Sequence, residues 1–379
     1  MNAIGNLLQE TGFALLRQPD SWKNLVMLLV ACFLLYLAIG RRSQPLVLCA
    51  AAFGMILANL PGSELFHEIL FAGGGVQLSL LRGEPVTQAC LASLAASGVP
   101  QSVLSSVQAG QTITPGIADF LYLGTALGIY PCLLLMGLGA RTDFGPLLAR
   151  PCSLLLGAVS QFGVFAAMAL LSALGLTGRE AASAALAAGL GGPAAVFVSA
   201  RLAPHLLAPI AFSVCLCMAV APKLSSWLAP RTAAAQQVQE PGKTELVLFP
   251  ILSTIFVSLL LPAAGALIGS LMLGNLLRVC GVTERLSQMV RQEFFHIALI
   301  FQSLCLGLAA NGRSMLSWKT AAVLVLGLAG FCFGALCRAL VSRLFRRGAC
   351  SSDAAFTGLD AQSLLGSILA AGFLLGTLA

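Results

Sequence analysis

The stretch from Ala181 to Pro209 constrains the fold of this chain more than any other. It reads AASAALAAGLGGPAAVFVSARLAPHLLAP and is apolar enough to lie in a lipid bilayer, but Gly191, Gly192 and Pro193 interrupt it. Proline removes a backbone donor, and glycine adds backbone freedom. Because hydrocarbon offers no water to the freed peptide groups, such a break persists only inside protein or beside a wet cavity. The interruption predicts either the solute site of a transporter or a kink between closely packed helices, and both interpretations stay open here.

The composition assigns the whole chain to the membrane. Of its 379 residues, 58% are hydrophobic and only 9% are charged, whereas soluble domains carry about 25% charged residues. The net charge of +7 does not indicate nucleic-acid binding, because the basic residues cluster in short loops beside apolar runs, as orientation in a bilayer requires. The 12 cysteines form no metal-ligand pattern, since most lie inside apolar runs and no paired histidines accompany them.

We expect an all-α polytopic membrane protein with about ten transmembrane segments, in two inverted-repeat halves with broken or re-entrant helices. The expected domains are a surface segment over 1–22, a first half over 23–222 with an amphipathic connection over 62–116, a polar linker over 223–244 and a second half over 245–379. The expected spans are Asn24 to Gly40, Leu46 to Leu60, Ile117 to Ala140, Cys152 to Leu176, Leu206 to Pro222, Glu245 to Leu261, Ala263 to Leu277, Phe294 to Ala310, Ala321 to Ala339 and Gly358 to Ala379.

Charge and repetition give two further indications. Lys and Arg concentrate in cytoplasmic loops. If 223–244 is cytoplasmic, most of the arginines of the second half also fall in cytoplasmic loops, including those that follow Ala321 to Ala339. In the first half, a re-entrant 181–200 places one more arginine on the cytoplasmic side than a spanning 181–200 does, so the charge rule favours the re-entrant form. The runs Leu135 to Gly139 and Leu271 to Asn275 each end an apolar span before a short polar turn. This similarity is the sequence evidence for a repeat.

Several stretches resemble one family. They include IYPCLLLMGLGARTDFGPLLA from Ile129, Gly192-Pro193, LAPHLLAPI from Leu202, Lys243-Thr-Glu, and LMLGNLLR from Leu271. Together they resemble the membrane β subunit of sodium-pumping, biotin-dependent decarboxylases that act on oxaloacetate, methylmalonyl-CoA or glutaconyl-CoA. The similarity covers 24–60 and 118–340, and its Thr-Asp-Phe-Gly-Pro-Leu-Leu run is the most specific part.

The resemblance implies a function in an assembly. A carboxyltransferase subunit would load a biotin carrier, and this subunit would decarboxylate carboxybiotin, consume a proton and move Na⁺ outward. It also implies a small membrane γ/δ subunit, a homo-oligomer, and a multi-pass location in the bacterial inner (plasma) membrane, with the lipid bilayer as a partner and no nucleic acid.

The departures from the family pattern bear on the Na⁺ site. The family motif Gly-Gly-Ala-Asp-Gly-Pro has an aspartate where this chain has Gly191, and the family Tyr-Ser-Tyr-Met run is Cys215-Leu-Cys-Met here. A shortened late hairpin leaves Asp360 and Ser367 as its remaining polar residues. Na⁺ prefers hard oxygen ligands, so the first-half site is reduced to backbone carbonyls and Ser199.

The candidate residues for the ion and carboxybiotin pathway are Asp143, Gly191, Gly192, Pro193, Ser199, Asn275, Asp360 and Ser367; no catalytic residue is assigned. Asp143 is more readily a helix cap than an ion relay. Asn275 either lines the cavity or bonds across helices, and Asp360 is either an intramembrane carboxylate or part of a surface loop. His205 and His296 are predicted to be interfacial anchors or packed side chains rather than proton relays.

Three functions remain in competition at this point. The first is the β subunit of a sodium-translocating decarboxylase. The second is a diverged transporter-like paralogue, and the third is a docking subunit that has lost Na⁺ coupling. The first alone predicts Na⁺-dependent decarboxylation by a complex that contains a biotinylated subunit.

Overall fold

In the computed structural model, the regular secondary structure of the described residues is helical. It describes residues 21–40, 45–60, 62, 65–96, 99, 101–104, 107–149, 153–189, 191–228, 241–281, 284–344 and 361–378. Within these ranges there is no strand, and one isolated bridge joins Pro85 to Thr112. The segment 1–20, most of the predicted linker and Asp360 lie outside them.

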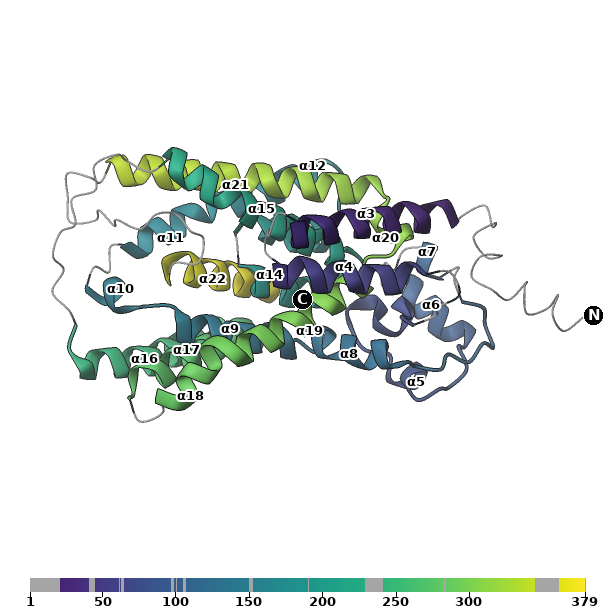
Figure 1. Ribbon diagram of the computed structural model, residues 1–379, viewed down its shortest axis with the longest axis horizontal. Helices are drawn as coiled ribbons and strands as arrows, with labels where there is room; N and C mark the ends of the chain where they lie inside the picture. The colour runs from purple at the N-terminus through teal and green to yellow at the C-terminus, as the bar shows by residue number, and fades with distance from the viewer. Residues whose placement is uncertain are drawn as a thin grey trace, which may run out of the picture. The chain divides into compact units, whose positions relative to one another are not determined.

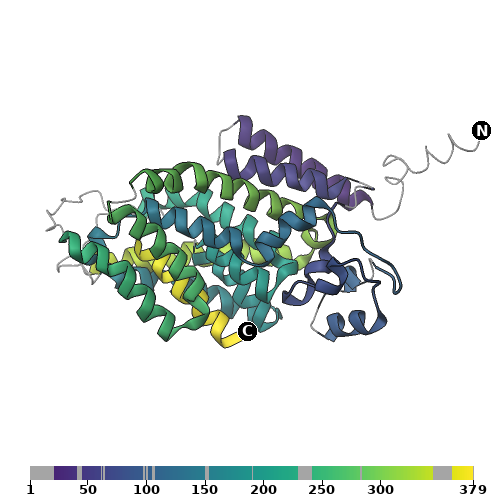
Figure 2. The same cartoon turned by 90° about the horizontal axis from the view of Figure 1, so that it is seen from below.

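The chain forms two compact units, each described here by itself. Unit 1 comprises Met1–Tyr130, Ala203–Pro209 and Leu299–Thr320. Its helices and 3₁₀ helices are α3 (Ser21–Gly40), α4 (Pro45–Asn59), η1 (Glu68–Gly74), α5 (Leu78–Leu81), α6 (Gln88–Ala96), α7 (Gln101–Leu104), α8 (Ile117–Ala126), η4 (Pro204–Leu206), α20 (Gly312–Met315) and most of α19 (Phe295–Leu308). Figure 2 shows α3 and α4 as a pair of purple helices lying side by side.

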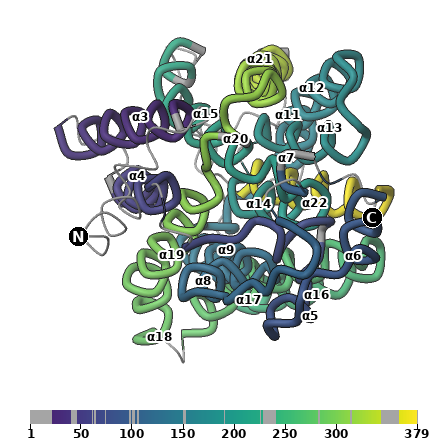
Figure 3. Tube along the Cα trace, turned by 90° about the vertical axis from the view of Figure 1, so that its right-hand side faces the viewer, coloured from purple at the N-terminus to yellow at the C-terminus, as the bar shows by residue number. Residues whose placement is uncertain are grey.

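Unit 2 comprises Pro131–Leu202, Ile210–Ala298 and Ala321–Ala379. Its elements are α9 (Ile129–Arg141), α10 (Gly145–Ala149), α11 (Leu154–Ser160), α12 (Phe162–Ala173), α13 (Gly178–Ala185), η3 (Leu186–Gly189), α14 (Gly192–Leu202), α15 (Leu207–Leu228), α16 (Lys243–Leu260), η5 (Pro262–Ala264), α17 (Gly265–Val279), α18 (Glu284–Met289), the π-helix η6 (Val290–Phe294), α21 (Trp318–Leu344) and α22 (Ala361–Leu378). α14 packs against α22, as Figures 1 and 3 show, and α16 packs against α17 (Figure 1).

The helices confirm a polytopic membrane protein. Seven helices of the described residues are long and apolar enough to cross a bilayer, and the bent pair α8–α9 adds an eighth if it is one span. The Pro262 break between α16 and α17 falls where the sequence predicts it. The described residues of 62–116 include four short helices, η1, α5, α6 and α7. The total of about ten segments, the inverted repeat and the domain boundaries stay predictions.

Glycines set how closely the helices of unit 2 approach. A Cβ on Gly139 of α9 would overlap the carbonyl oxygen of Leu271 on α17, and a Cβ on Gly274 of α17 would overlap that of Met136 on α9. The two runs that resemble each other in the sequence therefore pack directly on one another. Because there is no hydrophobic drive between helices in lipid, such small-residue crossings supply the close packing that holds them together.

Candidate functional site

The predicted break in the Ala181–Pro209 stretch is present in unit 2. α13 ends at Ala185, η3 continues to Gly189, Gly191 lies outside any helix, and α14 starts at Gly192. Pro193 occupies the first turn of α14, where its missing N–H leaves no intrahelical bond unmade. The described residues on both sides of the break are almost all buried in protein. The chain therefore meets the condition for a broken helix in a bilayer, since protein covers it.

The break is held against α22. A Cβ on Gly191 would lie 2.5 Å from the hydroxyl oxygen of Ser367, and a Cβ on Gly192 would lie 3.3 Å from Val214 Cγ1. Ser367 is buried, and its hydroxyl donates to the carbonyl oxygen of Leu364 at 2.9 Å. The Ser367 oxygen keeps its lone pairs for another partner. Only a residue without a side chain fits between the break and this hydroxyl.

Gln161 brings a side-chain amide to the same place. It lies between α11 and α12, and its Nε2 donates to Ser160 Oγ at 3.2 Å. Its Oε1 is buried and has no hydrogen-bond partner within the part of the chain that the structure describes. A Cβ on Gly189 would lie 3.2 Å from this oxygen. An unpartnered amide oxygen therefore lies beside the last residue of η3.

A small cavity adjoins the break. It is lined by Ser160, Ala188, Gly189, Phe331, Gly334, Ala335 and Ser363, with a volume of about 10 Å³ for the centres of water molecules. That volume suits a single water or an ion of similar size. Two hydroxyl-bearing side chains contribute to the lining, so a bound water or ion would find oxygen partners.

Arg338 places a positive charge beside Ser363, one of the residues that line this cavity. The charge pattern of the sequence groups Arg338 with the loop arginines that follow Ala321 to Ala339, and this assignment is wrong, because Arg338 lies inside α21 and is buried. Its guanidinium donates to Ser363 Oγ at 2.6 Å and to Gln362 Oε1 at 3.3 Å, both at the start of α22. The sequence signal for this burial is that Arg338 lies within the apolar run Ala321 to Ala339. An ionisable residue inside a membrane helix is a functional candidate by default.

The other predicted site residues lie in different surroundings. Ser199 is buried further along α14 and donates to the carbonyl oxygen of Ala195. Asn275 is buried at the α9–α17 crossing, and Asp143 is exposed in the loop after α9. No hydrogen bond among the described residues joins Asn275 or Asp143 to the break. The structure thus brings together Gly191, Gly192, Pro193 and Ser367 and leaves Asp143 and Asn275 apart.

The surroundings of Asp143 favour the capping interpretation. Its Oδ1 accepts from the Gly145 N–H at 3.1 Å, ahead of α10, and its Oδ2 lies 3.7 Å from Arg278 Nη2. We expect Asp143→Asn to change the free energy of unfolding by less than about 1 kcal/mol, because asparagine keeps the acceptor and an exposed ion pair contributes little. Thermal unfolding in detergent measures this. A Na⁺ requirement altered by Asp143→Asn would contradict the capping role.

Comparison with known proteins agrees with the motifs. A sequence model of the Na⁺-transporting oxaloacetate decarboxylase beta subunit matches residues 23–350. The chain belongs to this β-subunit family. Its members are the membrane subunits of sodium-pumping decarboxylases, so the chain is a subunit of a decarboxylase complex.

Individual relatives carry three different decarboxylase names. The methylmalonyl-CoA decarboxylase subunit beta of Propionigenium modestum is 38% identical, over 88% of this chain and 80% of its own length. The probable oxaloacetate decarboxylase beta chain of Vibrio cholerae is 34% identical, over 86% and 81%. The glutaconyl-CoA decarboxylase subunit beta of Acidaminococcus fermentans is 33% identical, over 91% and 80%. Three substrate acids are named among comparably similar relatives, so similarity to this β subunit does not select one.

Proposed function

We propose that this β subunit decarboxylates carboxybiotin and couples that reaction to outward Na⁺ movement, with both events at the break between η3 and α14. Membership of the family supports the pairing of the two activities. The observation that carries the location is the buried Gln161 oxygen without a partner, next to a break that a hydroxyl, an arginine and a small cavity surround.

Na⁺ would bind on the oxygen side of the break. The end of a helix leaves carbonyl groups without intrahelical partners, and η3 ends beside Gln161 Oε1. An unmade hydrogen bond to a buried polar atom costs about 1–3 kcal/mol, so a cation at this oxygen would offset that cost. Ser367 Oγ would add a second side-chain oxygen. Such hard ligands suit Na⁺ as they suit other hard cations.

The carboxylate of carboxybiotin would bind on the opposite face of the break. The first N–H groups of α14 point out of its N-terminus, where the helix dipole favours an anion. Arg338, which is hydrogen-bonded to Ser363 on α22, would add a positive charge for the carboxylate. In the reaction, the bond between the carboxylate carbon and the biotin nitrogen breaks and its electron pair goes to nitrogen. Nitrogen then takes up one proton, and CO₂ leaves.

The partners follow from the same proposal. A carboxyltransferase subunit selects the substrate acid and loads a biotin carrier, which brings carboxybiotin to this subunit. A small membrane γ/δ subunit and further copies of this chain complete the assembly in the bacterial inner (plasma) membrane.

One observation favours the alternative of a subunit that has lost Na⁺ coupling. Residues 186–202 contain no aspartate or glutamate, and Gly191 stands where the resemblance places a carboxylate. A cation bound only by neutral oxygens in a low-dielectric interior is held less strongly. The two functions differ in one measurable property, the effect of Na⁺ on the rate of decarboxylation by the assembled complex.

Gln161→Leu tests the site with a closely matched control. We expect the Na⁺ concentration for half-maximal decarboxylation to rise by about tenfold or more, equivalent to about 1.4 kcal/mol. The control is Gln302→Leu in unit 1. Gln302 is also buried, its Nε2 donates to Thr125 Oγ1 at 3.3 Å, and its Oε1 lacks a partner among the described residues. Both substitutions therefore remove the same kind of group from a buried place.

Two outcomes would decide against the proposal. If the wild-type complex decarboxylates at the same rate with and without Na⁺, coupling is absent and the alternative holds. If Gln302→Leu raises the Na⁺ requirement as much as Gln161→Leu does, the effect is a general cost of losing a buried amide, and the break is not the ion site.

A further inference from the structure

Unit 1 contains a pocket that the proposed Na⁺ and carboxybiotin chemistry does not use. Its titratable lining residues are Glu68, Tyr122 and His205, and its apolar ones include Phe66, Phe71 and Val103. The volume open to the centres of water molecules is about 20 Å³, enough for one or two waters. Two of the three histidines of the chain, His67 and His205, lie in or beside it.

Glu68 is fixed in this pocket by a chain of hydrogen bonds. Asn311 Nδ2 donates to Glu68 Oε2 at 3.1 Å. Asn59, at the end of α4, donates to the carbonyl oxygen of Ala310 at 2.8 Å and accepts from the Gly312 N–H at 2.9 Å. The two residues that flank Asn311 are therefore clamped. Glu68 is held by a side chain whose own position is set by the adjacent helix.

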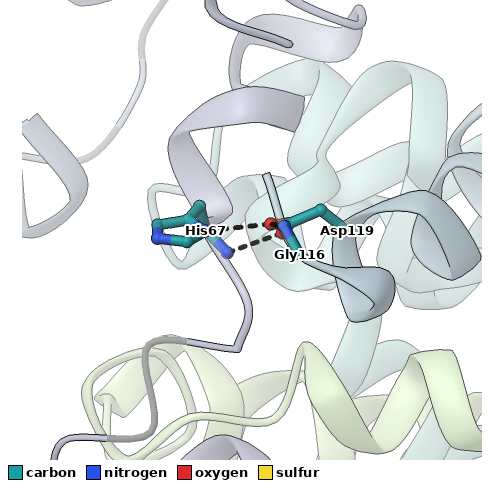
Figure 4. A network of polar contacts seen from close by, with 3 residues as sticks. All are labelled: His67, Gly116 and Asp119. Atoms are coloured by element: carbon teal, nitrogen blue, oxygen red, sulfur yellow. Dashed lines mark hydrogen bonds and ion pairs between the residues drawn. The ribbon is translucent and has the colours of Figure 1, made fainter. Parts of the chain in front are cut away.

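The residue before Glu68 is fixed just as firmly (Figure 4). Asp119 is fully buried, and its carboxylate accepts from the His67 N–H at 2.8 Å and from the Gly116 N–H at 3.0 Å, while His67 Nδ1 lies 2.9 Å from its Oδ2. Both oxygens of the Asp119 carboxylate are therefore engaged. This carboxylate fixes His67, the residue that precedes the start of η1.

Aromatic rings make the walls of the pocket. Tyr122 contacts Phe66 edge-on at 4.8 Å and Phe71 at 4.6 Å between ring centroids. Burial raises the pKa of the Glu68 carboxyl group, while the bond from Asn311 and the nearby His205 oppose the rise. His205 is the basic group among the pocket's lining residues. A carboxyl and an imidazole, both half-buried, thus line the same small pocket.

The charge pattern assigns this pocket to a side of the membrane. The span Pro204–Leu224 starts at the pocket and ends beside the basic residues Lys223, Arg231 and Lys243. The positive-inside rule places those basic residues in the cytoplasm. The end that carries His205 then belongs to the outer side, three residues along the chain from the end of α14.

We propose that the Glu68 pocket is a proton-binding site on the outer side, in which the Glu68 carboxyl and the His205 imidazole together take up one proton. The titratable groups that face it are His67 beside η1, Asp119 and Tyr122 on α8, His205 on η4 and Cys305 on α19. Asp119 already accepts two backbone N–H bonds and contacts His67 Nδ1. Glu68 and His205 are the carboxyl and the imidazole that line the pocket itself.

The site deepens the proposed function, because cleavage of carboxybiotin consumes a proton. Uptake needs a group that is protonated near neutral pH and lies close to the compartment that supplies the proton. An ordinary exposed glutamate is almost fully ionised there. The histidine interpretation from the sequence changes accordingly: His205 is a packed residue whose imidazole also faces a carboxyl.

Infrared titration of carboxyl groups in the purified full chain tests the proposal without turnover. We expect a protonated-carboxyl band whose apparent pKa is raised above that of a normal glutamate, because burial disfavours the charged carboxylate. Glu68→Gln removes this band while keeping an acceptor for Asn311. The matched control, Glu84→Gln, replaces an exposed glutamate of the same unit and leaves the band in place. His205→Phe moves the apparent pKa of the band, because Glu68 loses its basic neighbour.

Several outcomes would overturn the site. A band that survives Glu68→Gln belongs to another carboxyl. A band displaced by added Na⁺ at constant ionic strength marks a Na⁺ site, which is a different proposal. The unfolding temperature of Glu68→Gln shows whether the variant is folded. If the band is present but the complex shows no Na⁺-dependent decarboxylation, the proposed function fails while the proton site stands.

Discussion

Gly139→Ala and Gly274→Ala are each expected to destabilise the subunit by about 3 kcal/mol or more, beyond the usual range for an overpacked site. In each case the added Cβ would overlap a backbone carbonyl oxygen, that of Leu271 or that of Met136. A carbonyl in a helix cannot rotate away as a long side chain can. The helices α9 and α17 would have to separate, and the contacts along the whole crossing would weaken with them.

Unfolding of the detergent-solubilised protein with heat measures this effect, and two further variants make it interpretable. Gly376→Ala on α22 is the control, because its Cβ would meet nothing within 4 Å; we expect no loss, or a small gain from better helix propensity. The double variant should cost less than the sum of the two singles, since one separation accommodates both methyl groups. Equal stability of Gly139→Ala and Gly376→Ala would contradict the close crossing.

The elements that the sequence predicts well depend on local chemistry. The break around Gly191 to Pro193 follows from missing donors and missing side chains, and the break at Pro262 follows for the same reason. Most spans agree within a few residues, because an apolar run and its polar ends are properties of neighbouring residues. α15 is an exception, since it continues to Leu228 through residues assigned to the polar linker.

The features that the sequence could not predict are contacts between distant segments. In the sequence, Gln161 is a single polar residue in an apolar run, and only the fold shows that its side-chain oxygen lies beside Gly189. Arg338 falls near the end of a run, and only its bonds to Ser363 and Gln362 show that it points inward. The role of Asp119 could not be predicted, because nothing near it in the sequence indicates His67, 52 residues away, as its partner.

The similarity of the runs Leu135 to Gly139 and Leu271 to Asn275 is instructive. As a pattern it indicates repetition. In the structure its glycines let each run approach the backbone of the other. The two segments meet closely because both have small residues at the crossing.

Gly191→Asp is expected to inactivate the subunit rather than restore a family-like Na⁺ site. The Cβ of any residue at 191 would lie 2.5 Å from Ser367 Oγ and 2.6 Å from Ser367 Cβ. Ser367→Ala leaves the Cβ conflict in place, so only glycine at 367 makes room. In this chain a serine on α22 occupies the space that an aspartate at the break would need. The two positions are therefore coupled, and changing one alone measures strain rather than ion affinity.

The double variant Gly191→Asp/Ser367→Gly should recover decarboxylation that Gly191→Asp loses by about 100-fold, a loss of about 2.7 kcal/mol. It should also lower the Na⁺ concentration for half-maximal rate by about tenfold, because a carboxylate now faces the ion. Gly191→Asn/Ser367→Gly is the matched control: it has the same shape without the charge, and it should recover activity without the gain in Na⁺ affinity. Ser367→Gly alone gives the cost of a glycine within α22, about 1 kcal/mol.

Two outcomes would contradict this coupling. If both double variants remain as inactive as Gly191→Asp, contact with Ser367 is not what excludes a side chain at 191. If the aspartate and asparagine double variants have the same Na⁺ affinity, the ion binds away from the break.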